Sequence, residues 1–200
     1  MSGDAPGAAA GPRHRSRVRD AVLDRRSYSR VTEPAPTHEE LLPLVEAAGR
    51  IADHRSLRPW RIIELRGDAR HRLGEAFAVC EGGRGTDAAK AAGKPLRAPL
   101  LLAIVGVHRP SGKVPVWEQD AVAAGVAHTL SLMLDDEGWG VIWRTGHYTR
   151  SKAVKRMHGL GPNERLLGWL YVGGKPERAP GKGSGAPKLV DADRFVSVLD

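Results

Sequence analysis

The sequence predicts a layered sandwich of helices and strands, of the α+β or α/β class. Four short apolar runs have the length and composition of strands, and segments with helical spacing lie between them at irregular intervals. No G-x-G-x-x-G fingerprint joins a strand to a helix, which argues against a Rossmann domain. Because there is no internal repeat, we expect one domain over residues 17–200, preceded by a disordered leader over residues 1–16.

The first half of the chain predicts three helices and a strand. Thr37 to Glu40 form a capping box ahead of a helix that should end near Gly49. Pro43 would break a hydrogen bond inside that helix, so we expect the helix to start nearer Glu39, which leaves the proline in the first turn. The other elements of this half are a helical segment at 18–23, a polar loop at 51–60, a strand at 61–65 and a helix at 68–79.

The second half predicts three strands separated by helices. The continuous apolar run at 98–107 is bounded by Pro99 and Pro110 and suits a central strand covered on both faces. In residues 121–138, apolar side chains recur at helical spacing among small residues, which is typical of a core or interface helix. The remaining elements are a mobile glycine-rich segment at 81–94, a strand at 140–146, a basic helix at 151–161, a strand at 166–174 and a Gly/Lys/Pro-rich tail.

Composition and charge narrow the function classes. No apolar run approaches the ~20 residues that a membrane span needs. The net charge of +8 raises nucleic acid as a partner, but the cations are spread along the chain and only 5% of residues are aromatic, so we expect neither a binding stripe nor a stacking platform. The single cysteine, Cys80, and a start without a secretory signal indicate a cytoplasmic protein.

No motif for metal, nucleophilic or nucleotide-loop chemistry is present. The eight histidines show no H-E-x-x-H pattern, and Walker loops and nucleophile elbows are missing, so an enzyme with this sequence would use an organic cofactor. One candidate anion site is D-R-R-S-Y-S-R, at residues 24–30, where arginines offer planar forks of donors and serines offer hydroxyls. Solvation of a helix end explains the same seven residues equally well.

Four segments, in order along the chain, resemble the FMN-dependent nitroreductase family, in particular its short branch of NAD(P)H nitroreductases. They are R-R-S-Y-S-R with E-P-A-P-T, A-D-H-R-S-L-R-P-W, R-A-P-L-L-L-A-I-V-G with K-V-P-V-W-E-Q-D, and G-V-I-W-R-T-G. The match runs from about Arg25 to about Pro176. The resemblance implies an α+β homodimer, built as a three-layer sandwich with a central, mostly antiparallel sheet flanked by helices, and with FMN held where the protomers meet.

The same resemblance implies eight cofactor-binding residues and no obligatory catalytic side chain. They are Arg25, Arg26, Ser27, Arg50, His54, Trp143, Arg144 and Thr145. The first three match the family's opening motif, which holds the phosphate and ribityl end of the flavin. The next two match positions that reach the flavin bound mainly by the other chain. The last three match a segment that lies along the cofactor.

The implied function is transfer of hydride from NAD(P)H through flavin N5 to a small acceptor, such as a nitroaromatic or a quinone. An alternative is a non-redox or flavin-processing FMN-binding protein on the same fold. It arises because Ser29 stands where many members carry a cation near N1 and the C2 carbonyl of the flavin. Arg58 is the sequence candidate for supplying that charge.

Overall fold

The computed structural model describes residues 16–177 and 189–199, which belong to two units. The smaller unit joins the two ends of the chain, and its described parts include helix α1 (Arg17–Asp24) and the 3-10 turn η4 (Ala192–Arg194). The larger unit runs from Arg26 to Pro180 and contains the sheet. Nearly all of the predicted leader at 1–16 lies outside the described residues, and a single domain over 17–200 stays a prediction.

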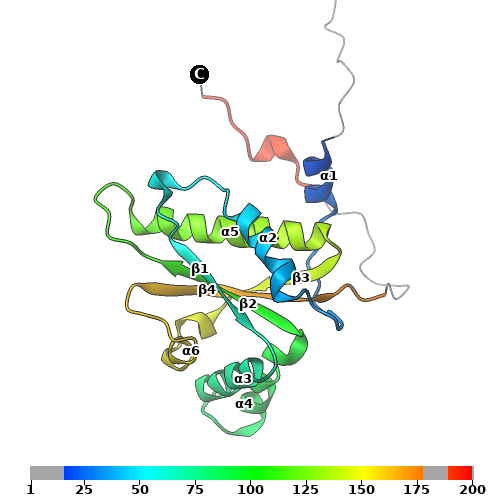
Figure 1. The fold of residues 1–200 in the computed structure, drawn as a ribbon, viewed down its shortest axis with the longest axis vertical. Helices are drawn as coiled ribbons and strands as arrows, with labels where there is room; N and C mark the ends of the chain where they lie inside the picture. Colours follow the sequence, from blue (N-terminus) through cyan, green and yellow to red (C-terminus); the bar gives the residue numbers. More distant parts are fainter. Residues whose placement is uncertain (1–15, 178–188, 200) are drawn as a thin grey trace, which may run out of the picture. The chain divides into compact units, whose positions relative to one another are not determined.

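Four antiparallel strands form the centre of the larger unit, in the order β1-β2-β4-β3 (Figure 1). All four predicted strands are confirmed, and the antiparallel pairing places the fold in the α+β class. Their bounds are β1 Trp60–Leu65, β2 Leu100–Val107, β3 Trp139–Arg144 and β4 Glu164–Gly174. The central strand β2 is buried along almost its whole length, as its continuous apolar run predicted.

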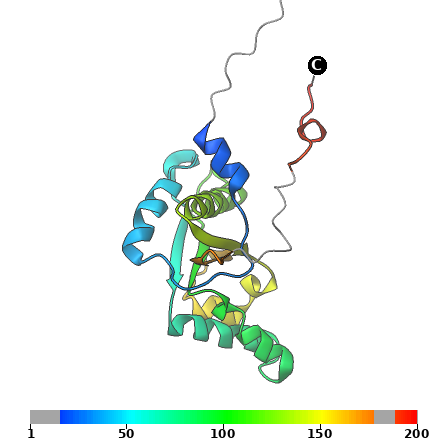
Figure 2. The ribbon, with the colours of Figure 1, turned by 90° about the vertical axis from the view of Figure 1, so that its right-hand side faces the viewer.

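Helices cover both faces of this sheet, which gives the expected three layers (Figures 1 and 2). On one face lie α2 (His38–Ala48) and α5 (Val116–Asp136). On the other side lie α3 (Asp68–Cys80), α4 (Gly85–Ala92) and α6 (Lys152–Met157). Because side chains alternate along each strand, the sheet contributes one apolar layer to each side, and two separate core clusters result.

Two predictions about the helices are wrong. Helix α2 begins at His38, directly after the capping-box residue Thr37, so Pro43 lies in the second turn rather than the first. The capping box and the buried face of the helix hold it together despite the lost hydrogen bond. The glycine-rich segment at 81–94, expected to be mobile, contains α4, because its alanines pack against α3, where Gly74 leaves room for the approach.

A polar chain attaches the α3 and α4 helices to η3 (His147–Arg150), the turn that follows β3. The hydroxyl of Tyr148 donates to Glu81 Oε1 at 2.6 Å and accepts from Lys94 Nζ at 2.7 Å. Burial raises the pKa of Tyr148 to about 12, and the bond to Glu81 adds to the effect. The same bond lowers the pKa of Glu81. The turn after β3 is therefore fixed to the helical layer below the sheet.

His158 is a buried histidine, and its hydrogen bonds are those of a neutral imidazole ring. The indole N–H of Trp169 donates to Nε2 at 3.1 Å, so Nδ1 carries the ring proton and donates to the Val154 carbonyl at 2.9 Å. Its exposed fraction is 9%. Burial lowers the pKa of His158, and the bond to Val154 offsets this only in part.

We expect the free energy of unfolding to fall as the pH is lowered from about 7 to 5, because an unfolded histidine titrates near pH 6.5 and takes up a proton that folded His158 resists. One such group gives a slope of at most about 1.4 kcal/mol per pH unit. Urea unfolding at several pH values measures this slope. His158→Gln should lose most of it, whereas His71→Gln, at an exposed histidine of α3, should keep it. An unchanged slope in His158→Gln contradicts this account.

Candidate functional site

The segment that follows α1 is hydrogen-bonded to the edge strand β3 and to the end of β4. The backbone N–H of Tyr28 donates to the Val141 carbonyl of β3 at 3.0 Å, and Thr32 pairs with Gly174 of β4 through two main-chain hydrogen bonds. The second half of the D-R-R-S-Y-S-R motif is thereby held against β3. The structure thus brings together two of the segments that sequence analysis singled out.

Trp143 and Arg144 end β3 and point to opposite faces of the sheet, because strand residues alternate. The Trp143 ring meets the His128 ring of α5 edge-on, with centroids 4.9 Å apart. On the other face, the Arg144 guanidinium lies 5.4 Å from the centroid of the Tyr171 ring. Its Nη2 also makes a long hydrogen bond of 3.5 Å to the Ser29 carbonyl. Arg144 therefore contacts the Ser29 position, and the assignment of Arg58 to the N1 edge of the flavin stays a prediction.

Two buried donors at this end of β3 lack a hydrogen-bond partner among the described residues. They are Trp143 Nε1 and Arg144 Nε. An unpaired buried donor costs about 1–3 kcal/mol, so these atoms are candidates for contact with a ligand. Gly168 of β4 has a φ of +149°, and a Cβ there would be 2.5 Å from the Arg144 carbonyl oxygen and 2.6 Å from Trp143 Nε1.

Arg50 and His54 lie in another part of the larger unit. Arg50 is exposed just beyond the end of α2, and His54 begins the 3-10 turn η1 (His54–Ser56). His54 Nδ1 is 3.1 Å from Oε2 of Glu118 in the first turn of α5. His128, which contacts Trp143, lies ten residues further along α5, or about 15 Å away. One chain therefore contains two separate groups of candidate residues.

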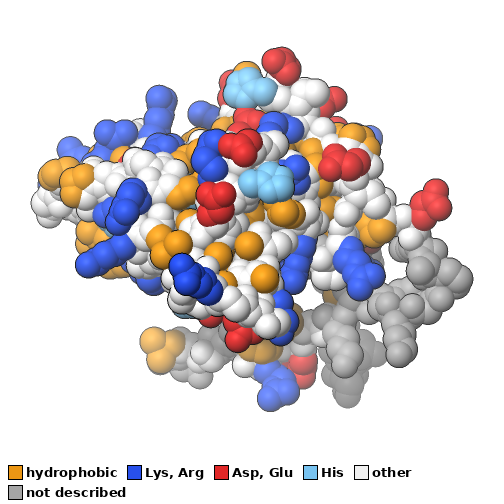
Figure 3. Space-filling view, turned by 90° about the horizontal axis from the view of Figure 1, so that it is seen from below, with side chains coloured by type: hydrophobic (Ala, Val, Ile, Leu, Met, Phe, Trp, Pro, Cys, Tyr) orange, Lys and Arg blue, Asp and Glu red, His pale blue; other side chains and the backbone are white. Residues whose placement is uncertain are grey.

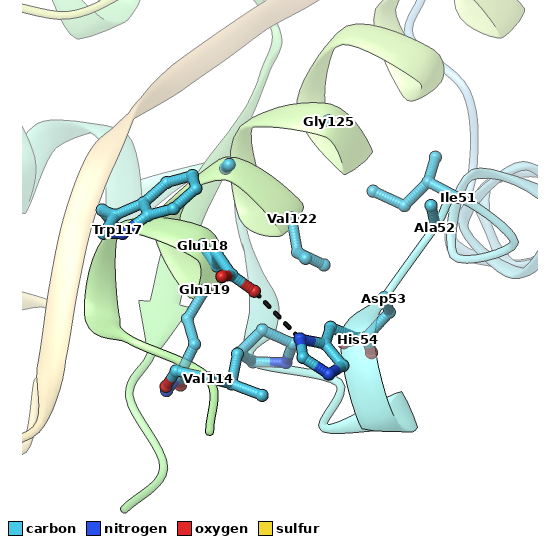
Figure 4. A pocket seen from close by; sticks show the side chains of 12 residues that line it. Ile51, Ala52, Asp53, His54, Val114, Trp117, Glu118, Gln119, Val122 and Gly125 are labelled. Atoms are coloured by element: carbon cyan, nitrogen blue, oxygen red, sulfur yellow. Dashed lines mark hydrogen bonds and ion pairs between the residues drawn. The ribbon is translucent and has the colours of Figure 1, made fainter. Parts of the chain in front are cut away.

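A cavity of about 420 Å³ opens between the His54 loop and the first turns of α5 (Figure 4). Its lining is mostly apolar and includes Ile51, Pro59 and Val122, with His54 and Glu118 as the paired polar groups. Trp117 also lines it and is 69% exposed. Volume and lining are in the range of small-molecule sites.

The loop at 53–58 has a strained backbone. Arg55, Ser56 and Arg58 have φ values of 66°, 50° and 47°, a region that side-chain-bearing residues rarely adopt. The carboxylate of Asp53 accepts two N–H groups of the same loop, the shorter bond being 2.7 Å from Arg58. Strain of this kind persists where surrounding contacts fix the backbone, and it is common at functional sites.

The other sequence-predicted residues occupy simpler positions. Arg25 belongs to the smaller unit and ends α1, where its N–H donates to the Ala21 carbonyl at 3.0 Å. Arg26 is partly exposed, Ser27 is exposed, and Thr145 is exposed directly after β3.

Sequence reasoning assigned no role to Glu118 or Gly168. An isolated glycine within a strand pattern signals close backbone approach and could have marked Gly168. The contact of Glu118 with His54 spans 64 residues and has no local signal.

Charges of both signs share the surface around α3 and α4. Figure 3 shows lysine and arginine side chains interspersed with acidic ones on the face seen there. Arg72 pairs with Asp68, and Lys90 Nζ lies 3.6 Å from Asp87 Oδ1.

Within residues 16–177 and 189–199, no three His, Cys, Asp or Glu side chains are grouped to hold a metal ion, and no helix has the length and apolarity to cross a membrane.

Comparison with known proteins gives a family match over most of the chain. Residues 22–174 match the family model described as the nitroreductase family. The Escherichia coli (strain K12) protein named "Putative NAD(P)H nitroreductase YdjA" is 34% identical over 157 residues, which are 77% of this chain and 86% of that protein. A Haemophilus influenzae protein named "Putative NAD(P)H nitroreductase" is 28% identical over 182 residues, or 89% of this chain and 97% of that protein.

Solved structures share the fold. The nitroreductase-like family protein from Bacillus cereus superposes with a TM-score of 0.75 at 18% identity, over 92% of this chain and 97% of that chain. The FMN and NADPH-dependent nitroreductase NfnB from sphigopyxis sp. strain HMH gives a TM-score of 0.69 at 19% identity, over 91% and 98% of the two chains. These similarities confirm the predicted nitroreductase-like α+β sandwich.

We expect Gly168→Ala to lower the free energy of unfolding by about 1–3 kcal/mol, because the new methyl group would clash with the end of β3 at a backbone angle that alanine disfavours. Urea unfolding measures the change. Gly161→Ala is a matched control, since the nearest atom to its new Cβ would be 3.4 Å away, and its cost should stay within about 0.5 kcal/mol. Equal stability of the two variants contradicts the close packing of β3 on β4.

Proposed function

The chain belongs to the nitroreductase family, and on that basis we propose that it is an FMN-dependent oxidoreductase that passes hydride from NAD(P)H to a small acceptor, such as a nitroaromatic or a quinone. The names of the relatives support NAD(P)H as the donor, and the name of NfnB supports FMN as the cofactor. When bound, FMN would supply the redox chemistry that links the hydride donor to the acceptor. The residues of this chain bind and orient the reactants.

The observation that best supports this proposal is that the segment at 26–29 contacts the end of β3. Arg144 reaches the Ser29 carbonyl through one long hydrogen bond and keeps a buried Nε without a partner among the described residues. A guanidinium with unused donors binds an anionic oxygen well, because its fork matches two oxygens of a phosphate. The residues present therefore fit the phosphate of FMN.

In this proposal the opening motif holds the polar end of the cofactor. Arg25 and Arg26 bind the phosphate, and the hydroxyl of Ser27 binds the phosphate or the ribityl chain. Thr145 offers a further exposed hydroxyl after β3, and Trp143 packs beneath α5. None of these side chains needs to act as an acid or a base for the cofactor to accept hydride.

We also propose that the protein is a homodimer with FMN at the interface. His54 and Trp143 contact α5 ten residues apart, and in the proposed dimer the group with Arg50 and His54 would come from the partner. The exposed apolar side chains of Val116 and Trp117 at the start of α5 suit burial against a second copy.

Light scattering should then give twice the chain mass of 21.6 kDa, and a monomer with bound FMN contradicts this arrangement.

A direct test is to add FMN to the purified protein, remove unbound flavin, and follow the visible absorbance during anaerobic titration with NADH and with NADPH. The proposal predicts a yellow protein that at least one donor bleaches and that an added quinone re-oxidises. A yellow protein that neither donor bleaches supports the non-redox alternative. A protein that stays colourless contradicts both.

Arg25→Ala and Arg144→Gln should each raise the dissociation constant for FMN by about 10- to 100-fold, because a hydrogen bond to a charged group is worth about 1.5–3 kcal/mol. Fluorescence quenching of free FMN measures the affinity. Arg72→Gln, at an exposed arginine of α3, removes the same charge elsewhere and should leave the affinity unchanged. Wild-type affinity in Arg25→Ala would show that the phosphate assignment is wrong.

A further inference from the structure

We propose that His54 is the proton donor in reduction of the acceptor, and that Glu118 positions its ring. The inference rests on the proposed function, since it concerns how an acceptor is reduced. His54 and Glu118 come from elements 64 residues apart in the sequence, pair with each other, and line the same cavity (Figure 4).

The pairing fixes which ring nitrogen can give up a proton. A carboxylate only accepts hydrogen bonds, so the Oε2 of Glu118, 3.1 Å from Nδ1 of His54, keeps a proton on that nitrogen. Nε2 is the nitrogen that Glu118 does not contact (Figure 4). The His54 side chain is 55% exposed, against 29% for Glu118, so a small molecule can approach the ring. Nε2 is therefore the donating atom when the ring is protonated.

The cavity suits a planar acceptor that carries an oxygen. Its volume of about 420 Å³ holds a small aromatic molecule, and Ile51, Val122 and Trp117 give it apolar and aromatic walls. Among the described residues that line the cavity, His54 and Glu118 alone form an ion pair with each other. An aromatic ring can thus stack on the apolar lining while its oxygen reaches Nε2.

The reaction consumes a proton that such a donor can supply. Reduction of a quinone to the hydroquinone consumes one hydride, which the proposed cofactor supplies, and one proton. In the proposed step the N–H bond at Nε2 of His54 breaks as an O–H bond forms on the acceptor, and water restores the proton after product release. Nδ1 keeps its proton and its bond to Glu118 throughout. Reduction of a nitro group to a nitroso group uses the same hydride and proton and releases water.

The backbone around His54 is held in place before any ligand binds. Three neighbouring residues in the loop at 53–58 have strained positive φ values, and the Asp53 carboxylate fixes the loop through two N–H groups. Such pre-organisation is what accurate proton transfer needs, because the donor must lie within hydrogen-bond reach of its target. Asp53 therefore joins Glu118 as a positioning residue.

The proposed donor makes acceptor reduction sensitive to pH. Glu118 is the charged group that faces the ring from α5, and Asp53, Arg55 and Arg58 are the charged residues of its own loop. The Asp53 carboxylate accepts hydrogen bonds from two main-chain N–H groups of the loop. Because the proposed step consumes the proton on Nε2 of His54, acceptor reduction should slow as the pH rises.

If the pair of His54 with Glu118 were only structural, the kinetic result would differ. Exposed ion pairs contribute about 0–1 kcal/mol to stability, so an ordinary surface pair would leave the kinetics unchanged when broken. The chain offers a matched control in His38, an exposed histidine at the start of α2 that pairs with Glu64 and does not line the cavity. His38→Gln removes an equivalent pair without touching the proposed donor.

The kinetic test uses the FMN-loaded protein, reduced in advance and mixed with a quinone over a range of pH. His54→Gln should slow acceptor reduction by about 10²-fold near neutral pH and abolish its decline toward alkaline pH. Glu118→Gln should slow it less and shift the profile, and His38→Gln should match the wild type. A His54→Gln protein with the wild-type rate and profile overturns the proposal while leaving the proposed function intact. A protein that binds no FMN overturns both.

A second measurement does not depend on the cofactor. Nitrogen-15 NMR of the histidine rings in FMN-free protein reports which ring nitrogen carries the proton in the neutral form. We expect His54 to hold its proton on Nδ1 in the wild type and to show a mixture of tautomers in Glu118→Gln. A wild-type ring protonated mainly on Nε2 overturns the positioning role of Glu118.

Discussion

The main-chain hydrogen bonds from residues 28–32 to β3 and β4 determine where the candidate anion-binding motif lies. They are possible because the sheet presents glycines where the segment crosses it. A Cβ at Gly173 would be 2.6 Å from the Thr32 carbonyl oxygen, and one at Gly140 would be 2.9 Å from a Val31 methyl group. These glycines let the segment approach closely, so Ser29 comes within reach of Arg144.

Helix α5 controls the other half of the candidate site. Near its middle His128 contacts Trp143, and near its start Glu118 contacts His54. An α-helix rises about 1.5 Å per residue, so the two contacts stay apart whatever the side chains do. In the proposed dimer, one flavin contacts the His54 group of one chain and the Trp143 group of the other.

Much of the fold could be predicted from local patterns, and the failures have physical causes. The four strands followed from apolar runs, and the capping box at Thr37 correctly marked the start of α2. The segment at 81–94 was misjudged because its glycines suggested a loop, whereas burial of its alanines against α3 decides the structure. The pairing of His54 with Glu118 depends on tertiary contacts, which no local pattern encodes.

A crystal structure of the protein with FMN tests most directly whether two copies of this chain share a flavin site. We expect the phosphate at Arg26 and Arg144 of one protomer, with His54 of the partner subunit near the ring system. A structure in which FMN binds within a single protomer, or in which its phosphate lies away from Arg144, would contradict it.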